Sequence, residues 1–247
     1  MSGHSKWSQI KRQKGATDVK RGAIFTKMTR EVMLAAKEGG SDPEANFRLR
    51  LAMDRARGVN MPLANIQRAI DRATGAAGGE LIESVLYEGY GPGGVSILVE
   101  AATDNRNRTA SEVRAAFTKH NGSLGGPGSV AWQFENKGVI EIATSDLDPD
   151  DVSLQAIDAG ADDVEADADS ITVYTSPVLL RQVKDALEKA GLKIDSAELS
   201  MRPTSAVVLD ADRATKVLRL VDALDDLDDV TKVHANFDVP AEILANA

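Results

Sequence analysis

The sequence of 247 residues contains no cysteine, three histidines and few aromatic residues. The absence of cysteine excludes disulfides, thiolate nucleophiles and cysteine-based zinc sites, and it is typical of a reducing compartment. Because aromatic residues make up 4% of the chain, alanine, valine, leucine and isoleucine must fill its cores. No apolar run approaches the roughly 18 residues of a membrane span, and residues 1–15 lack the apolar segment of a secretory signal. We therefore expect a cytoplasmic protein without a membrane partner.

Motifs of common catalytic and metal sites are also missing. The histidines are far apart, and neither the nucleophile-elbow nor the phosphate-loop pattern occurs. The aspartates of residues 146–151 suggest a calcium loop, but Asp151 and Ile157 stand where that loop needs glycine and glutamate. We expect these aspartates to favour a helix N-terminus instead. The sequence thus predicts a protein that is not an enzyme, with no catalytic residue, metal, cofactor or small-molecule substrate.

Residues 89–94 (GYGPGG) match the glycine pattern of dinucleotide sites. Such a site needs a helix directly after the glycines, so that the helix N-terminus faces the pyrophosphate. A predicted strand follows here, so we interpret residues 89–94 as a hairpin turn. Residues 125–128 (GGPG) are interpreted as a loop for the same reason.

Charge is divided unequally along the chain, although the net charge is only −9. Residues 1–75 contain 15 Lys and Arg against 7 Asp and Glu, whereas residues 76–247 contain 14 against 31. A basic segment attached to an acidic remainder indicates an anionic partner. The acidic runs at residues 162–169 and 225–229 are interpreted as solvated edges.

The positive charge is densest in the first thirty residues, where only Asp18 opposes it. Basic side chains attract phosphates through counterion release, and Trp7 offers a face for base stacking or for packing. The alternative is a solvated helix surface with a buried tryptophan. The residues predicted to bind nucleic acid are Lys6, Trp7, Lys11, Arg12, Lys14, Lys20, Arg21, Lys27 and Arg30.

Three helices are predicted within residues 1–75. In residues 20–38 the apolar positions follow helical spacing, and Lys20, Lys27 and Arg30 lie together on another side. Ser41 and Glu44 form a capping-box pair for a second helix that ends near residue 57, and Pro62 opens a third. The second and third helices could form a helix-turn-helix, or their arginines could simply pair with acids on the same helices.

Beyond the glycine-rich residues 74–79 the pattern changes to short strands separated by helices. Strands are predicted at 84–90, 94–102, 131–136, 138–143, 163–167, 170–175, 194–201, 204–209 and 231–237, and helices at 107–120, 149–159, 177–190 and 211–225. Helices packed on antiparallel sheets predict an α+β fold with two ferredoxin-like domains after the three-helix domain. Residues 80–130 hold too few elements for a domain, so the middle domain is inserted in the other. The predicted domains are 1–79, 80–130 plus 204–247, and 131–203.

Residues 103–109 (TDNRNRT) lie between a predicted strand and a predicted helix. Their polar side chains suit a helix cap, and Arg106 and Arg108 are a possible second contact to RNA or protein. The alternative is local capping together with a salt bridge to a neighbouring acid.

Several of these segments together resemble the YebC/PmpR family. The matching segments are residues 3–7 (GHSKW), 10–11, 14, 18–30, 60–62 (NMP), 65–66, 69–70, 87–92 (YEGYGP), 103–109 and 128–132 (GSVAW). The sequence departs from the pattern at Ala23, where lysine is common, and at residues 63–64, where Lys-Asp often follows the proline. The resemblance implies a three-domain cytoplasmic protein without catalytic residues.

The resemblance also implies one of two functions. One is DNA binding with control of transcription; the other is ribosome-associated action on translation, as a translational activator or at polyproline stretches. A long basic segment suits the irregular surface of ribosomal RNA better than a DNA groove, whereas descriptions of the family favour DNA. A third hypothesis is a protein–protein adaptor that uses its acidic domains. A monomer is expected.

Overall fold

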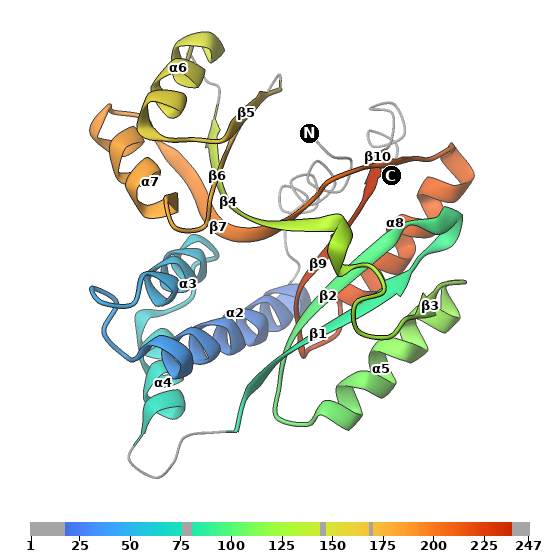
Figure 1. Cartoon of the computed structure of the whole chain (residues 1–247). Coiled ribbons are helices and arrows are strands. Elements are labelled where there is room, and N and C mark those ends of the chain that lie inside the picture. Colours follow the sequence, from blue (N-terminus) through green and yellow to red (C-terminus); the bar gives the residue numbers. More distant parts are fainter. Residues whose placement is uncertain (1–17, 76–80, 144–146, 168–169, 239–247) are drawn as a thin grey trace. The chain divides into compact units, whose positions relative to one another are not determined.

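A computed structural model describes residues 18–75, 81–143, 147–167 and 170–238, with side chains from residue 22 onward (Figure 1). The chain divides into two compact units, of which the first comprises residues 134–202. The second contains the described residues before 134 and after 202. No helix in the described ranges is both long and apolar enough to cross a membrane.

Three helices form the beginning of the second unit: α2 (Asp18–Gly39), α3 (Phe47–Gly58) and α4 (Leu63–Thr74). Their shared core contains Val32 and Ala36 of α2, Leu49 of α3 and Ile66 of α4, all fully buried. The spacing of these apolar residues at three, four or seven positions is what places one face of each helix inward. The prediction of a helical N-terminal region is confirmed.

The start of α3 differs from the prediction. Asn46 rather than Ser41 is the N-cap, and its side-chain oxygen accepts a hydrogen bond from the backbone N–H of Leu49. The Asn46 amide also donates to the carbonyl oxygens of Ala35 and Gly40 at the end of α2. Asn46 therefore satisfies groups at two helix ends at once, which a capping box at Ser41 and Glu44 could not do.

The sheet of the second unit has the strand order β3-β1-β2-β9. Its strands are β1 (Glu83–Tyr90), β2 (Ser96–Thr103), β3 (Ser123–Leu124) and β9 (Val230–Ala235). Helices α5 (Arg106–Lys119) and α8 (Ala211–Asp225) pack on one face, with Phe117 and Leu220 fully buried. Gly89 lies on this face, where an added Cβ would be 2.6 Å from the Phe117 ring. Leu86, Glu88 and Tyr90 consequently point to the opposite face, because side chains alternate along a strand.

Residues 89–94 form the predicted hairpin turn. Antiparallel β1 and β2 meet there, and a single 3-10 turn spans Pro92–Gly94. Gly93 has a φ of 79°, a backbone conformation that favours glycine. The glycines therefore serve a turn between strands and do not precede a helix.

The first unit has the strand order β5-β6-β4-β7. Its elements are β4 (Phe134–Ala143), α6 (Pro149–Ala159), β5 (Asp163–Ala166), β6 (Ser170–Thr175), α7 (Leu180–Lys189) and β7 (Ile194–Pro203). The chain order βαββαβ with this strand order is the ferredoxin-like arrangement. Asp148 caps α6 and two aspartates occupy its first turn, as predicted for residues 146–151; Asp146 itself lies outside the described residues.

The insertion of the middle domain is confirmed, and the two sheets have related topologies. The strand of the first unit that occupies the position of β1 is β6, the third strand of that ferredoxin-like fold. In the second unit β1 is instead the first strand in the chain, although the spatial order of the strands is the same. The predicted strands 131–136 and 138–143 are one strand, β4, preceded by a 3-10 turn at Ala131–Gln133. The predicted strand 204–209 is only the short β8 (Val207–Val208), which pairs in parallel with β10 (Phe237–Asp238).

Candidate nucleic-acid interface

Most of the predicted nucleic-acid-binding residues cannot be placed. Those that lie outside the described residues are Lys6, Trp7, Lys11, Arg12 and Lys14. Lys20 and Arg21 belong to the first turns of α2, but their side chains fall outside the description. Lys27 and Arg30, one turn apart on α2, are the members of the set whose side chains the structure describes.

Lys27 is 9% exposed. Its Nζ donates to the backbone carbonyl oxygen of Asp225 and lies 3.1 Å from that residue's Oδ1. Both acceptors are at the end of α8, where backbone carbonyls are left without partners in the helix. A lysine at this position therefore stabilises a helix C-terminus.

Arg30 is held in the same region. Its guanidinium lies 2.6 Å from Oδ1 of Asp229 and donates at 3.1 Å to the carbonyl oxygen of Ala102. The prediction that Lys27 and Arg30 share a face of α2 is correct, and both side chains pair with aspartates of the same chain; their contact to nucleic acid stays a prediction. That face packs on the α8–β9 turn, so the aspartates of residues 225–229 that contact α2 are not a solvated edge.

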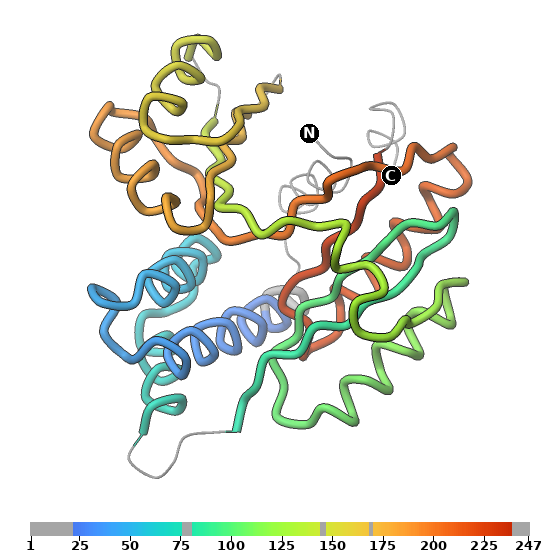
Figure 2. The backbone as a smooth tube through the Cα atoms, in the orientation of Figure 1, coloured from blue at the N-terminus to red at the C-terminus, as the bar shows by residue number. Residues whose placement is uncertain are grey.

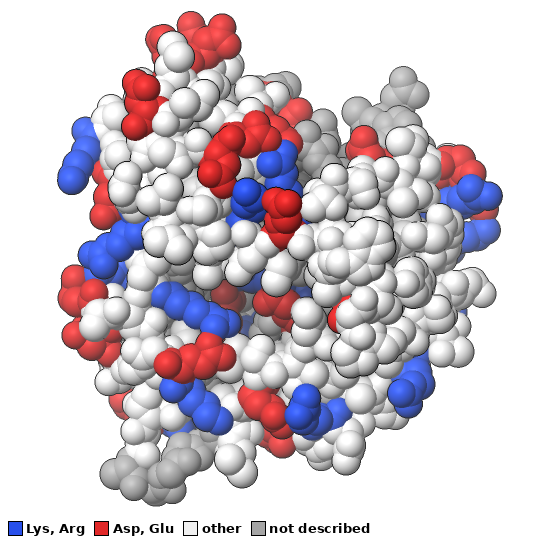
Figure 3. Space-filling model, viewed as in Figure 1, with Lys and Arg blue, Asp and Glu red and all other residues white. Residues whose placement is uncertain are grey.

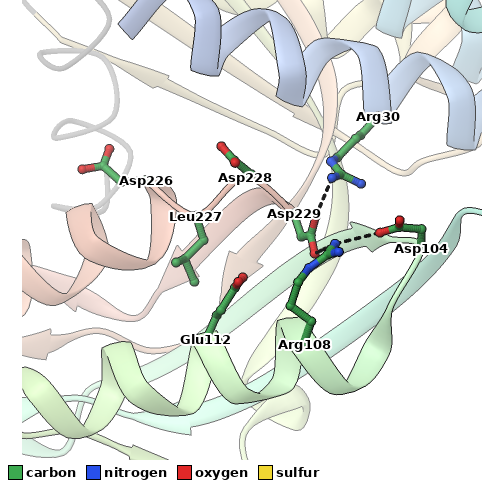
Figure 4. A pocket seen from close by; sticks show the side chains of 8 residues that line it. All are labelled: Arg30, Asp104, Arg108, Glu112, Asp226, Leu227, Asp228 and Asp229. Atoms are coloured by element: carbon green, nitrogen blue, oxygen red, sulfur yellow. Dashed lines mark hydrogen bonds and ion pairs between the residues drawn. The ribbon is translucent and has the colours of Figure 1, made fainter. Parts of the chain in front are cut away.

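Asp229 is the centre of this contact and is 1% exposed. Figure 4 shows Arg30 reaching it from α2 and Arg108 from α5. The carboxylate accepts hydrogen bonds from Arg108 at 2.7 Å, from the Thr109 hydroxyl at 2.6 Å and from the Thr103 hydroxyl at 3.0 Å. Helices α2 and α5, the end of β2 and the α8–β9 turn are thereby joined at one buried charge.

The surroundings of Asp229 determine its protonation. Burial alone would raise its pKa, since a charged carboxylate loses its hydration. The hydrogen bonds from Thr109 and Arg108, the positive charge of Arg30 and the hydrogen bond from Thr103 outweigh burial and hold the pKa of Asp229 below 3.8. Asp229 is therefore ionised at neutral pH and acts as a fixed counter-charge for two arginines.

The two arginines of the predicted second contact, Arg106 and Arg108, have different surroundings. Arg108 lies between Asp229 and Asp104, with both distances at 2.7 Å. Its hydrogen bond lowers the pKa of Asp104. Arg106 is largely exposed, 3.7 Å from Glu83. Residues 103–109 thus form a helix cap, with the Asn105 side chain accepting from the backbone N–H of Arg108, and an ion pair; a nucleic-acid contact there stays a prediction.

A cleft of about 490 Å³ opens beside Asp229. Its charged lining consists of five acids and two arginines: Asp104, Glu112, Asp226, Asp228, Asp229, Arg30 and Arg108. Acids in this excess repel phosphate, and both arginines already have carboxylate partners. Among the described residues no group of three or more His, Asp or Glu side chains could hold a metal ion. As lined by the described residues, the cleft marks a junction between α2 and the sheet, and its acidic lining does not favour a polyanion.

The remaining arginines of the helical region are largely neutralised by acids. Those of α3 pair with neighbours: Arg48 with Glu38, Arg50 with Glu44, Arg55 with Glu31, and Arg57 with Asp54. On the face drawn in Figure 3, blue and red side chains accordingly lie next to one another. Residues 22–75 contain nine Lys and Arg against six Asp and Glu, whereas residues 1–21 contain six against one. The excess positive charge is therefore concentrated in the first 21 residues.

Helix α4 presents a different surface. Gln67 and Arg68 are exposed on it, and their side chains bond to Asp71 and Asn65 of the same helix. The turn at residues 59–62 joins α3 to α4, as in the helix-turn-helix layout considered for these helices. Gln67 and Arg68 carry the donor and acceptor groups that read base edges in a major groove.

A second cluster joins two of the sequence motifs, residues 87–92 and 128–132. Glu88 is buried on β1, and its carboxylate accepts hydrogen bonds from the backbone N–H groups of Gly128 (2.6 Å), Val130 (2.7 Å) and Ala131 (2.8 Å). Burial raises the pKa of Glu88, but these backbone bonds and that of Ser129 lower it below 4.5 overall. In Figure 2 the segment after β3 runs across β1 and β2 at this point.

Sequence reasoning placed Asp229 in an acidic run and placed Glu88 and Trp132 within motifs, but it assigned none of them a role. Both acids are single residues whose partners come from distant segments, so spacing gave no signal. One signal could have identified Glu88: it lies within a predicted strand, where side chains alternate between the two faces of the sheet. A carboxylate on a buried face of a sheet needs hydrogen-bond partners.

Comparison with known proteins gives matches over nearly the whole chain. The family models described as "TACO1/YebC protein N-terminal domain" and "TACO1/YebC second and third domain" match residues 5–76 and 82–237. Proteins from Trichlorobacter lovleyi and Roseiflexus castenholzii, each named "probable transcriptional regulatory protein", are 54% and 53% identical. The alignments cover 98% of this chain in both cases, and 98% and 97% of the relatives.

A solved structure agrees in fold as well as in sequence. The crystal structure of a conserved hypothetical protein from Aquifex aeolicus superposes with a TM-score of 0.85 and is 47% identical. It covers 92% of this chain and 94% of its own. With the helical region, both α+β domains and the separate motifs all matched, the chain belongs to the TACO1/YebC family.

Proposed function

We propose that this protein is a non-enzymatic, nucleic-acid-binding regulator of gene expression that acts in the cytoplasm, with residues 1–21 as its main phosphate contact. The observation that carries the proposal is the distribution of charge. Arginines of the described α3 pair with carboxylates, while the first 21 residues carry six basic residues against one acid. An excess of positive charge of this kind favours binding of a polyanion, which releases its counterions.

Control of transcription through DNA is the first candidate. The names of the relatives from Trichlorobacter lovleyi and Roseiflexus castenholzii support it. The exposed Gln67 and Arg68 of α4 also support it, since a second helix in this layout reads the major groove. In this case Gln67→Ala and Arg68→Ala are expected to relax sequence preference without abolishing binding.

Action on RNA or the ribosome is the second candidate. A pair of exposed aromatic side chains, Tyr90 and Trp132, favours it, because aromatic rings stack on unpaired bases and duplex DNA offers none. The two candidates predict different partners for the same basic segment.

Two measurements over one salt series separate these candidates. One is cosedimentation of the full chain with ribosomes, and the other is selection of bound fragments from genomic DNA. Recovery of a defined set of promoter fragments, without ribosome cosedimentation, supports transcription. Cosedimentation that persists at physiological salt without fragment selectivity would rule out transcription. Absence of binding in both would reject the whole proposal.

The basic segment can be tested directly by replacing Lys11, Arg12 and Lys14 with alanine. Each lost phosphate contact lowers the slope of log K against log salt by about 0.9, so the slope should fall by about two to three. Fluorescence anisotropy with labelled nucleic acid measures this slope. Replacement of Lys184, Lys189 and Lys193 changes the net charge equally in the acidic inserted domain and should leave the slope unchanged. Equal slopes for the first variant and the unmodified protein would show that this segment is not the phosphate contact.

A further inference from the structure

Tyr90 and Trp132 belong to the sequence motifs at residues 87–92 and 128–132, to which the basic segment gives no role. Tyr90 ends β1, on the face opposite α5 and α8, and Trp132 lies in the 3-10 turn before β4. The Tyr90 hydroxyl donates to the carbonyl oxygen of Ser129 at 2.9 Å, and Trp132 Nε1 donates to the same oxygen at 3.2 Å. One backbone atom therefore holds the polar edges of both rings close together.

Both rings are exposed, and Trp132 is the more exposed of the two. Trp132 is 74% exposed and Tyr90 is 38% exposed, with Leu86 also exposed two residues before Glu88 on the same strand face. A tryptophan in this position buries little apolar area and contributes little to folding. Its exposure therefore needs a reason other than packing.

The backbone beneath the rings is held firmly. Glu88 accepts three N–H groups of residues 128–131, and Val130 is fully buried. On the other side Gln133 is fixed by the backbone N–H of Thr204 and by the side chain of Asn236. An exposed ring on a rigid support loses little freedom when a ligand stacks on it.

The loop that carries Trp132 has no charged side chain of its own. Residues 125–133 (GGPGSVAWQ) contain no charged side chain, although residues 76–247 carry 31 acids against 14 basic residues. Glu88 is buried, and backbone donors compensate its charge. The loop thus presents aromatic rings without an exposed carboxylate that would repel phosphate.

We infer that Tyr90 and Trp132 form a stacking site for unpaired bases of single-stranded RNA. The inference rests on the proposed nucleic-acid function and names a second contact, distinct from the basic segment. Exposed aromatic rings on a protein surface are one of the ways in which proteins bind unpaired bases. Stacking supplies affinity here, while residues 1–21 hold the phosphates.

The test compares full-length variants by anisotropy with a labelled single-stranded RNA of about 12 nucleotides. Trp132→Ala and Tyr90→Ala should each weaken binding about tenfold, within a range of about five- to 150-fold for one lost stack. The salt slope should not change, because no phosphate contact is lost. Trp132→Phe should recover most of the affinity, and Leu154→Ala, an exposed apolar residue of the inserted domain, should have no effect. Circular dichroism confirms folding of each variant.

Duplex DNA and single-stranded DNA of matching sequence serve as further arms. Duplex affinity should be unaffected by Trp132→Ala, and the DNA strand should bind no more tightly than the RNA. Unchanged RNA affinity of both alanine variants would overturn the stacking site while the proposed function stands. Equal losses of affinity for duplex and single strand, or tighter binding of the DNA strand than of the RNA, would also overturn it. If the unmodified protein binds no nucleic acid, the proposed function itself fails.

Discussion

Replacement of Asp229 by alanine is expected to lower the free energy of unfolding of the unit formed by residues before 134 and after 202 by about 3 kcal/mol. Asp229 is buried and is the counter-charge of both Arg30 and Arg108. Its removal takes the carboxylate from Arg30, whereas Arg108 keeps Asp104, and the Thr103 and Thr109 hydroxyls each lose one acceptor. Removal of one partner from a buried ion pair typically has this effect, because the charge that remains, here that of Arg30, is less well compensated.

Thermal and urea denaturation, followed by circular dichroism, would measure the change. For a unit of this size about 3 kcal/mol corresponds to a fall in Tm of roughly 6 to 12 °C. Asp228→Ala is the matched control, since Asp228 is exposed in the same turn and should change stability by less than about 0.5 kcal/mol. If both variants unfold alike, Asp229 is not the residue that joins α2, α5 and the turn.

The effect should also depend on pH with a defined sign. The folded-state pKa of Asp229 is below its ordinary value of 3.8. A carboxylate with a lowered pKa contributes stability that is fully present above its unfolded pKa and is lost as pH falls through the folded one. The difference between the unmodified protein and Asp229→Asn should therefore be constant near neutrality and shrink below about pH 4. A difference that grew on acidification would contradict this account.

Local signals allowed most of the fold to be predicted. The bounds expected for α6 and α8 agree with those observed, because each helix begins after an aspartate N-cap, Asp148 or Asp210, and has regular apolar spacing. The insertion of the middle domain followed from counting elements, since the two strands and one helix predicted in residues 80–130 are too few for an α+β domain. The N-cap of α3 was missed because Asn46 is selected by a tertiary contact with the carbonyl of Ala35. No pattern of spacing contains that information.

The candidate site was less predictable for the same physical reason. Helical phasing correctly grouped Lys27 with Arg30, yet their partners Asp225 and Asp229 lie about two hundred residues later. Only the position of α8 and β9 against β2 brings these charges together. The sequence of an acidic run such as residues 225–229 is the same whether the run faces solvent or packs against a basic helix. Charge patterning therefore predicted the kind of partner but could not separate an internal partner from an external one.

Glu88→Ala should have an effect of similar size through a different mechanism. The change removes the acceptor of three backbone N–H groups in residues 128–131. Buried donors left without acceptors cost about 1 to 3 kcal/mol each, and water can reach part of this loop, so a total of about 3 kcal/mol is expected. Glu88→Gln keeps one acceptor oxygen, so its loss of stability should lie between zero and that of Glu88→Ala. Glu112→Ala, at an exposed position on α5, is the control.

Hydrogen exchange locates this effect in the loop. Amides of residues 128–131 should lose protection by about tenfold or more in Glu88→Ala, whereas amides of α5 change only with global stability. The pKa of Glu88 lies below its ordinary 4.5, so this protection is present above about pH 4.5 and lost as pH falls through the folded pKa. Because the same loop supports Trp132, Glu88→Ala should also weaken single-stranded RNA binding without altering its salt slope. Full RNA affinity in a variant whose loop exchanges freely would show that the rings do not need a rigid support.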